Sequence, residues 1–349
     1  MAGLAVKIVN PLECSSWDQL LLSHPDYSFF HSSRWAEVLL EAYNYKPSYF
    51  TVAGNNSLSA LVPVMEINSP LTGKRGVSLP FTDYCDPLFT RDFESSKIFD
   101  CLVERGAAAG WKFIEIRGAC GLFKDKPESS CSYGHTLTLS DGGEDKDIFS
   151  RFRDSTKRNI KKALREGVDV RLDTSTRAVK EFYRLNCITR RQHGLPPQPY
   201  GFFKSLHKNV ISRDMGFIAL AYHKKAVVAG ALYVHFGEKA IYKYGASDRT
   251  YNLLRANNII MWEAIKWYAE RGYKQFCFGR TEPGNSGLRQ FKTGWGTTER
   301  TIKYYRYDFC KKAFVQAPLK VSGAHNGIFR KMPAPLLRGA GALMYRHMG

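Results

Sequence analysis

The chain has 349 residues, of which 44% are hydrophobic and 13% aromatic, and it carries a formal net charge of +19. This length exceeds a usual domain of about 100–200 residues, and the apolar content excludes a disordered chain. No window approaches the roughly 18–20 uninterrupted apolar residues of a membrane-spanning helix and no signal peptide is recognisable, so we expect a cytoplasmic protein.

The positive charge is concentrated in the second part of the chain. Residues 1–140 carry 12 Lys and Arg against 15 Asp and Glu, whereas residues 141–349 carry 39 against 17. This asymmetry favours a polyanionic partner, which is either RNA, a nucleotide-linked substrate or an anionic membrane surface. A generally basic soluble protein is the alternative, because charge alone indicates neither fold nor chemistry.

The eight cysteines form no Cys-x-x-Cys pair and lie near no two histidines at metal-ligand spacing. Several, such as Cys277 between two phenylalanines, lie in apolar runs. We therefore predict reduced, buried thiols and no metal site. A nucleophilic cysteine is the alternative, although no arrangement of Cys and His supports one.

The first part of the chain combines helices with a hairpin. In chain order we expect a strand at 5–9, helices at 15–22 and 33–42, a hairpin of 49–53 and 58–67, a helix at 93–110 and strands at 112–117 and 133–139. Trp35 lies on the apolar face of the second helix. Two prolines and two aspartates make residues 77–90 a loop. The polar candidates of this loop are Asp83, Tyr84 and Asp86.

An acidic, glycine-containing run at 140–145 is the expected domain boundary. A basic helix follows at 149–167, in which seven Lys and Arg accompany only two acids. Solvated helices usually mix the two signs, so this one is suited to phosphates. Beyond it we expect helices at 178–193 and 201–210, strands at 217–223, 226–236 and 239–245, a helix at 254–272, a strand at 274–279, a short helix at 287–292 and a strand at 301–309.

This order of elements is typical of an α+β fold, and the two parts repeat it in outline. The last residues, 313–349, contain five Lys and Arg and no acid, and they include an apolar face around 336–344. Such a segment can lie on anionic lipid or pack against the N-terminal domain, and we expect the second. The expected domains are therefore 1–140, 141–312 and a tail, 313–349.

Residues 276–296 combine the features of a polar site. A short apolar run stops at Gly279, Arg280 follows at once, and a loop leads to the short helix at 287–292. A buried strand that ends in charge before a helix N-terminus is a common way to build such a site. An ordinary strand–loop–helix connection with solvated charges is the alternative.

This stretch also contains a motif with the spacing G-L-x-x-F-K-x-x-W-G. Its residues are Gly287, Leu288, Phe291, Lys292, Trp295 and Gly296. The motif resembles the G-L-x-x-F-K-x-x-[FW]-G segment of the FemABX-like peptidoglycan-bridge aminoacyltransferases. The chain is also similar to their relatives that accompany bacterial exopolysaccharide genes, a GNAT-type acyltransferase group. Supporting runs lie at 29–35, 77–81, 190–196, 244–248 and 279–281.

The resemblance implies tandem GNAT-like domains with mixed sheets flanked by helices, and transfer of an acyl group to an amine. In the bridge enzymes the donor is an aminoacyl-tRNA and the acceptor a muropeptide precursor. Two departures leave the donor open. The helical arm that grips tRNA is absent, and residues 251–258 stand where ordinary GNAT enzymes have the R/Q-x-x-G-x-G/A cradle for acetyl-CoA. We expect either aminoacyl-tRNA or acyl-CoA as donor, and no permanently bound cofactor.

Acyl transfer to an amine needs a neutral amine, a positioned carbonyl and hydrogen-bond donors for the oxyanion. Lys292 is the candidate for anchoring a phosphate or the oxyanion, with a surface lysine as the alternative. Asp83 and Asp248 are candidates to orient or deprotonate the amine, unless they cap turns. Arg280 is a candidate anion clamp, unless it pairs with Glu282 or Asp248. The remaining candidates for substrate binding are Trp35, Tyr84, Arg190, Arg191, Tyr244, Ser247 and Asn258.

Three functions fit the sequence. The first is an acyltransferase that moves an aminoacyl or acyl group onto an amine of a cell-envelope or exopolysaccharide precursor, either free in the cytoplasm or peripheral to the inner face of the membrane. The second is an acyl-CoA-dependent N-acyltransferase. The third is a non-catalytic basic module for RNA or membranes, which predicts steeply salt-dependent binding without a small-molecule cleft.

Overall fold

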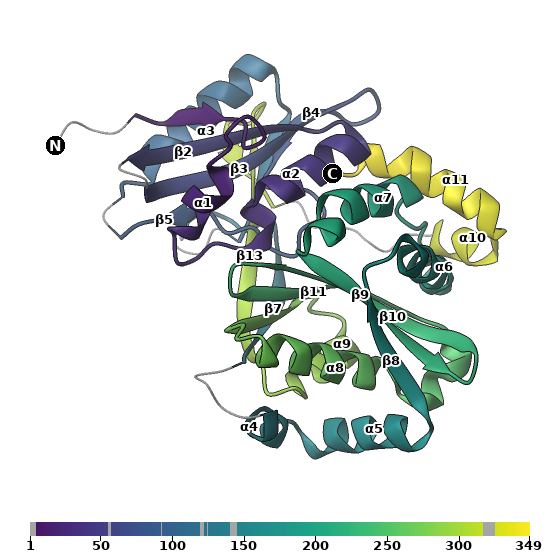
Figure 1. Ribbon diagram of the computed structural model, residues 1–349. Helices are drawn as coiled ribbons and strands as arrows, with labels where there is room; N and C mark the ends of the chain where they lie inside the picture. Colours follow the sequence, from purple (N-terminus) through teal and green to yellow (C-terminus); the bar gives the residue numbers. More distant parts are fainter. Residues whose placement is uncertain are drawn as a thin grey trace. The chain divides into compact units, whose positions relative to one another are not determined.

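The computed structural model describes residues 5–54, 57–91, 93–118, 122–123, 125–139, 145–316 and 325–349. The chain divides into two compact units (Figure 1). Unit 1 comprises 1–132, 301–320 and 344–349, and unit 2 comprises 133–300 and 321–343. Each unit has its own hydrophobic core.

These units differ from the expected domains. The predicted boundary at 140 lies outside the described residues, and the division falls instead at 132, within strand β7 (Ser130–Thr138). Residues 301–320 join unit 1 because β13 (Thr298–Asp308) pairs with β6 (Phe113–Arg117) of that unit. The expected tail is divided as well, since 321–343 belong to unit 2 and only 344–349 return to unit 1.

Unit 1 is built on a sheet of order β1-β2-β3-β4-β6-β13, in which only the pair β4–β6 is parallel. Its other strands are β1 (Lys7–Val9), β2 (Lys46–Gly54), β3 (Ser57–Ser69), β4 (Gly73–Val77), β5 (Leu88–Phe89) and β14 (Ala313–Phe314). Its helices are α1 (Trp17–Leu22), η1 (Phe29–His31), α2 (Ser33–Tyr43), α3 (Ser96–Ala109) and η4 (Tyr345–His347). The predicted hairpin is confirmed as β2 and β3, whose strands are longer than expected.

The core of unit 1 follows from simple local signals. The Ser32 hydroxyl accepts a hydrogen bond from the Trp35 backbone and starts α2, and Asn44 in the left-handed conformation ends it. The apolar face of α3, with Ile98 and Leu102, packs on the sheet. Burial of such side chains contributes about 1.5–3 kcal/mol each.

Unit 2 is built on a sheet of order β7-β12-β11-β10-β9-β8. Its further strands are β8 (Val168–Asp173), β9 (Gly216–His223), β10 (Ala226–Phe236), β11 (Lys239–Ser247) and β12 (Gln275–Thr281). Its helices are α4 (Asp145–Ser150), α5 (Asp154–Arg165), α6 (Thr176–Gln192), α7 (Tyr200–Asn209), η2 (Ile211–Arg213), η3 (Arg249–Leu254), α8 (Ala256–Glu270), α9 (Ser286–Thr293), α10 (His325–Lys331) and α11 (Ala334–Met344). In Figure 1, α5 and α8 lie on one side of this sheet and α6 on the other.

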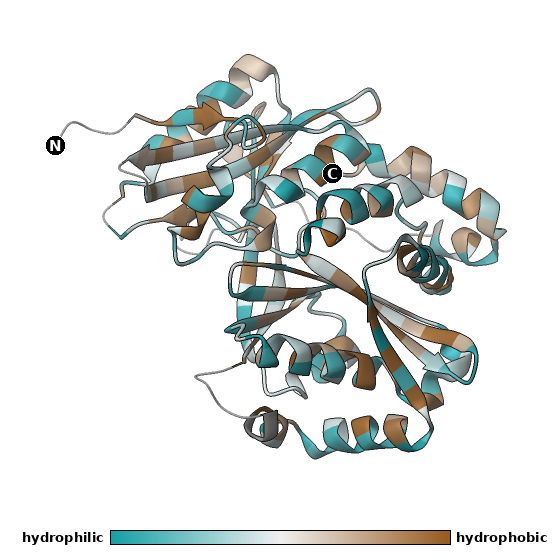
Figure 2. Cartoon of the chain, in the orientation of Figure 1, coloured by the Kyte–Doolittle hydropathy of each residue, from teal (hydrophilic) through white to brown (hydrophobic). Residues whose placement is uncertain are grey.

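The hydrophobic pattern explains these layers. In β8 apolar and polar residues alternate, and its apolar side chains Val168, Val170 and Leu172 join the core under α5 and α8 (Figure 2). Helix α5 is amphipathic, because Ile160 and Ala163 are buried while its cations lie outside. Among the described residues, no helix has the length and apolar character needed to cross a membrane.

The single basic helix expected at 149–167 is wrong, since the structure has two helices, α4 and α5. The break follows from packing. Phe152 is buried between Trp262 and Trp295, and the Arg153 N–H donates to the Gly294 carbonyl, outside any helix. The seven described cysteines are thiols rather than disulfides; Cys85, Cys187 and Cys277 are buried as predicted, whereas Cys310 is exposed, and Cys120 lies outside the described residues.

Candidate functional site

The sheet of unit 2 opens between its two central strands. β11 and β12 are parallel neighbours only over Lys239–Ile241 and Gln275–Cys277. Beyond these pairs both fully described strands continue, β11 to Ser247 and β12 to Thr281, without pairing with each other. Past this point each strand is hydrogen-bonded to its outer neighbour, β10 or β7, so the backbone groups of its other edge face the opening.

A bulge shapes the β12 side of this opening. The register between β12 and β7 shifts between Cys277 and Arg280, and Gly279 has φ +70°. Glycine adopts this left-handed conformation without the steric cost of a side chain. In the bulged strand the Arg280 carbonyl accepts a hydrogen bond of 2.7 Å from the Lys292 ammonium. The two predicted residues are therefore brought together.

The motif helix α9 is fixed by the residues around Lys292. Trp295 is fully buried and packs against Phe152 and Phe278. The Thr156 hydroxyl donates to the Gly294 carbonyl at 3.0 Å, which ties α9 to α5. As a result the Lys292 side chain is only 2% exposed, so the alternative of a surface lysine is wrong. Its ammonium donates its hydrogen bond to a backbone carbonyl of the bulge, that of Arg280.

A buried polar group that the sequence did not reveal lies beside Lys292. His135 of β7 is fully buried, and its Nε2 lies 3.0 Å from Oε2 of Glu299. Arg289 of α9 donates to both oxygens of Glu299, at 2.8 and 2.6 Å, and lies over the ring of Tyr133. Tyr133 and His135 lie far in sequence from Arg289 and Glu299, so only Arg289, inside the motif, carried a local signal.

The electrostatics of this group follow from its surroundings. Burial, followed by the repulsion of Lys292, holds the pKa of His135 below its ordinary value, and this favours the neutral imidazole. The hydrogen bond from Arg289 lowers the pKa of Glu299. Nearby, the buried hydroxyl of Thr281 has no hydrogen-bond partner in the described part of the chain. Unsatisfied buried polar atoms are uncommon and often mark functional positions.

A pocket of 220 Å³ lies where β11 ends and α8 begins. Three of the predicted residues, Ser247, Asp248 and Asn258, line it together. Arg255, at the N-terminus of α8 with φ +58°, and Phe291 of the motif helix contribute to the same wall. A cation beside the free N–H groups of a helix N-terminus suits a phosphate. The pocket is lined by part of residues 251–258, the stretch that stands where ordinary GNAT enzymes have the acetyl-CoA cradle.

Asp248 has a structural role within this pocket. Its carboxylate accepts hydrogen bonds from the Thr250 backbone at 3.0 Å and from the Thr250 hydroxyl at 2.8 Å, and so it caps η3. Turn capping, the alternative given above, is thus present in the structure. The Arg280 side chain is half-buried in β12.

The other predicted residues of unit 2 are spread over its helical side. Tyr244 is half-buried against Phe202 and Phe203. Arg190 donates to the Pro196 carbonyl at 3.2 Å and so stabilises the loop after α6. Arg191 donates to the Arg330 carbonyl at 3.3 Å and so connects α6 with α10. Lys243, which the sequence did not single out, is a buried cation 4.8 Å from the ring of Tyr244.

Three predicted residues belong to unit 1. Trp35 is fully buried and packs edge-on against Phe29 and Phe30, so the prediction of substrate contact is replaced by a core role. Its helical spacing had already placed it on the apolar face. Tyr84 packs edge-on against Phe30 and stays half-buried. The backbone carbonyl of Asp83 accepts a hydrogen bond of 2.9 Å from the Tyr304 hydroxyl.

Residues 150–293 match the family described as "Acetyltransferase (GNAT) domain". This range contains the opening between β11 and β12, the pocket at α8 and the motif helix, so these features all lie in the segment that matches this GNAT-type domain. Over 99 residues it is 32% identical to the lipid II:glycine glycyltransferase of Staphylococcus haemolyticus (strain JCSC1435). The match covers 26% of this chain and only 24% of that curated relative.

Solved structures extend the likeness to most of the chain. The crystal structure of FemX is similar with a TM-score of 0.65 at 14% identity, covering 85% of this chain and 96% of that one. A tandem GNAT protein from the clavulanic acid biosynthesis pathway is similar with a TM-score of 0.54 at 7% identity, covering 88% and 99%. The tandem GNAT-like fold and the resemblance to the FemABX-like GNAT superfamily are confirmed.

Proposed function

We propose that the protein is an acyltransferase that moves an aminoacyl or acyl group onto an amine of a cell-envelope precursor. One observation carries this proposal: within the GNAT-type domain, the opening between β11 and β12 lies on strands that lead to a pocket of about 220 Å³ with Arg255 at a helix N-terminus. A donor could place its phosphates in the pocket and its carbonyl in the opening. This arrangement argues against a merely basic binding module.

In the proposed reaction the acceptor amine attacks the donor carbonyl carbon. The new N–C bond forms while the C–O bond of an aminoacyl ester or the C–S bond of a thioester breaks, and the proton of the amine ends on the departing hydroxyl or thiol. The strand edges that face the opening offer backbone N–H groups to the oxyanion. The hydrogen bond from Lys292 to the Arg280 carbonyl keeps the bulged edge in place. Lys292 is thus proposed as a positioning residue for these donors.

The proposed acceptor is an amine on a precursor that is carried by a lipid or a nucleotide. The staphylococcal relative is a lipid II:glycine glycyltransferase, and the cations of this chain would favour the phosphates of such a carrier. An exopolysaccharide precursor is the variant that the family resemblance suggests.

We also propose that the protein works at the inner face of the membrane, held there by α10 and α11. One face of α11 is covered, since Leu337 is buried, whereas Ile328, Leu336 and Leu343 are 61–67% exposed. The cations of these two helices are Arg330, Lys331 and Arg338. Apolar side chains flanked by cations suit anionic lipid.

The test of the proposed function is a donor screen that detects free thiol from acyl-CoA or free tRNA from aminoacyl-tRNA. We expect one donor class to turn over with an amine acceptor. Lys292→Met should lower the rate about 100-fold or more, because a displaced oxyanion donor costs about 2.7–4 kcal/mol. Lys225→Met, which changes an exposed lysine in the turn after β9, is the matched control. Circular dichroism checks that both variants fold. No turnover with any donor, or equal rates for both variants, would contradict the proposal.

A further inference from the structure

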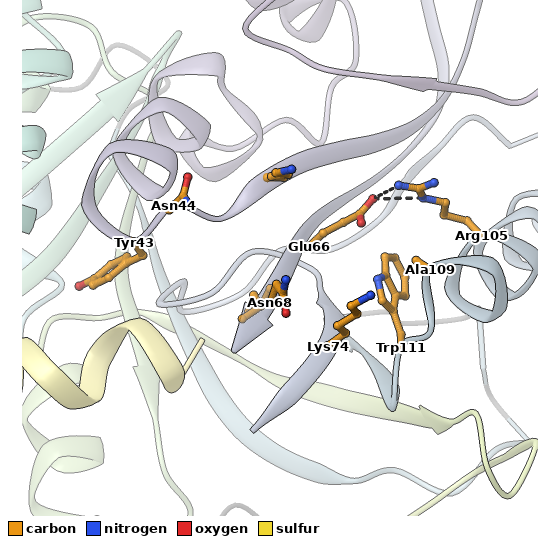
Figure 3. Close-up of a pocket in the computed structure, with 10 residues that line it drawn as sticks. Tyr43, Asn44, Glu66, Asn68, Lys74, Arg105, Ala109 and Trp111 are labelled. Carbon is orange, nitrogen blue, oxygen red and sulfur yellow. Dashed lines mark hydrogen bonds and ion pairs between the residues drawn. The ribbon is translucent and has the colours of Figure 1, made fainter. Parts of the chain in front are cut away.

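A second pocket lies in unit 1, outside the GNAT-type domain. It has a volume of about 460 Å³ and is formed by the end of α2, the start of β2, the end of β3, the start of β4 and the end of α3 (Figure 3). This volume lies within the range of about 300–1,000 Å³ that is usual for small-molecule sites. The proposed acyl transfer uses none of its residues.

Cations dominate the charge of this pocket, because Lys46, Lys74 and Arg105 line it together with a single carboxylate, Glu66. Arg105 donates twice to Oε1 of Glu66, at 3.1 and 2.8 Å, and the Ser48 hydroxyl donates to the same oxygen at 2.6 Å. Lys46 lies opposite Glu66 in the register of β2 and β3. Even so, neither Lys46 nor Lys74 has an ion-pair partner among the residues that the structure describes. Two unpaired ammonium groups in one pocket attract an anion.

The remaining polar groups suit hydroxyls. The second oxygen of Glu66, Oε2, accepts no hydrogen bond within the described part of the chain, and Figure 3 shows it on the side of Glu66 away from the dashed lines. The amides of Asn44 and Asn68 line the same space, and each can both donate and accept. A carboxylate and two amides are the groups that hold a polyhydroxylated ligand.

An aromatic wall completes the pocket. Figure 3 shows Trp111 beside Lys74, and only 4% of the Trp111 side chain is exposed. Its indole lies directly against β4 at Gly76, where a Cβ atom would come within 2.5 Å of the ring. The absence of a side chain at Gly76 therefore allows the ring to pack directly against the strand, and this packing keeps the wall rigid. The exposed edge of the ring gives the pocket a rigid apolar wall, which suits the C–H groups of a sugar.

We propose that this pocket binds a phosphorylated sugar. The phosphate lies between Lys46 and Lys74, and the sugar hydroxyls bond to Glu66, Asn44 and Asn68 beside the wall of Trp111. This site is independent of the acyl-transfer proposal, because its residues belong to unit 1 alone and the experiment below measures binding without a donor or an amine.

The test is calorimetry of the full chain with glucose 1-phosphate, inorganic phosphate and glucose as probes. We expect glucose 1-phosphate to bind at least tenfold more tightly than phosphate, and glucose to bind weakest. Lys46→Glu combined with Lys74→Glu should weaken glucose 1-phosphate at least tenfold, since hydrogen bonds to charged groups are lost and repulsion replaces them. Lys97→Glu, the same substitution at one exposed lysine near the other end of α3, should leave the affinity unchanged.

A second variant separates the sugar from the phosphate. Glu66→Gln replaces one carboxylate acceptor with an NH2 group and removes the negative charge, so it should weaken glucose 1-phosphate severalfold without weakening inorganic phosphate. Three results would overturn the proposal. The first is no detectable binding of glucose 1-phosphate, and the second is an affinity of the double variant equal to that of the wild type. The third is a loss of affinity in Lys97→Glu as large as that in the double variant, which would show a general effect of charge. Unfolding curves confirm that each variant is folded.

Discussion

At the scale of single residues, the unusual feature of the site is a pair of buried basic side chains, Lys292 on the motif helix and His135 on β7. Lys292 and His135 are 2% and 0% exposed, and they influence each other through charge. Lys292 bonds to the Arg280 carbonyl, whereas His135 lies beside the carboxylate of Glu299. Since burial penalises the charged imidazolium, the folded protein keeps His135 neutral in the presence of its charged neighbour.

This arrangement predicts a loss of stability in mild acid. The folded-state pKa of His135 lies below its ordinary value of 6.5, so the unfolded chain binds the proton first as the pH falls below that value. Stability therefore decreases from pH 6.5 downward. The His135→Gln variant should show a shallower fall in Tm between pH 7 and pH 5 than the wild type. His193 and His235, whose pKa values are also lowered by burial, remain in both proteins. Parallel curves would contradict the role of His135.

The sequence located part of this site and missed the rest for a physical reason. Lys292 and Arg280 are twelve residues apart around one turn of chain, so a motif and a strand end were enough to predict them. His135 and Glu299 lie on β7 and β13, and they meet Lys292 only through sheet pairing. No local pattern reports such pairing. The burial of Trp35 was visible in its helical spacing, whereas its candidacy for substrate binding is not supported by the structure.

At the scale of secondary structure, the bulge in β12 connects the motif helix to the opening in the sheet. Gly279 makes the bulge, and the bulge places the Arg280 carbonyl against Lys292. The strand and the short helix were both predicted from sequence at nearly these positions. The bulge was not predicted, because a glycine at the end of an apolar run reads equally as the end of a strand.

Gly279→Ala should therefore damage both stability and activity. An alanine at φ +70° costs about 1–2 kcal/mol, and relief of the strain would turn the Arg280 carbonyl away from Lys292. We expect a lower urea midpoint and a transfer rate reduced at least tenfold. Gly284→Ala is the matched control, since a Cβ there meets open space. If both variants behaved alike, the bulge would have no special role.

The amphipathic helix α11 makes a separate prediction for the membrane. Leu336→Asp combined with Leu343→Asp places charge on the exposed apolar face without touching the buried Leu337. We expect severalfold weaker co-sedimentation with vesicles that contain phosphatidylglycerol, and little binding of any variant to phosphatidylcholine vesicles. Leu253→Asp alters a leucine that is equally exposed but lies in η3, and it should bind like the wild type. Unchanged binding of the double variant would exclude this surface.

At the scale of the whole molecule, two basic features could each favour a different donor. The pocket with Arg255 has a volume of about 220 Å³ and suits the pyrophosphate of CoA. The outer face of α5, with Arg158, Lys161 and Arg165 exposed, is suited to a longer polyanion such as tRNA. Both features lie in unit 2, within the part of the chain that holds the excess of cations.

Charge reversal can separate these donors. Arg255→Glu should raise KM for an acyl-CoA donor at least tenfold and leave kcat nearly unchanged, because it removes an interaction with the non-reacting part of the donor. Reversal of Arg158, Lys161 and Arg165 together should instead weaken a tRNA donor, and it should reduce the slope of log affinity against log salt. Steady-state kinetics at several salt concentrations provide the measurement. A donor that responds to neither change would place its phosphates elsewhere.

The overall architecture was predictable from sequence, but its division was not. The order of helices and strands and the motif at 287–296 predicted tandem GNAT-like domains, which the structural neighbours confirm. The chain's return to unit 1 depends on backbone pairing between β13 and β6. The sequence near residue 301 predicts a strand but does not indicate which strand it pairs with. The acidic run near 140 was therefore the more visible signal of a domain boundary.

This return of β13 also has a consequence for how the protein forms during synthesis. Tyr305 of β13 belongs to the same core as Ile114 and Ile116 of β6. Until that strand leaves the ribosome, β6 has an open edge and part of the N-terminal core is uncovered. Residues 133–300, by contrast, form one continuous segment that contains nearly all of unit 2. The half that is translated first therefore finishes folding last, and a fragment that stops at residue 132 should aggregate rather than fold.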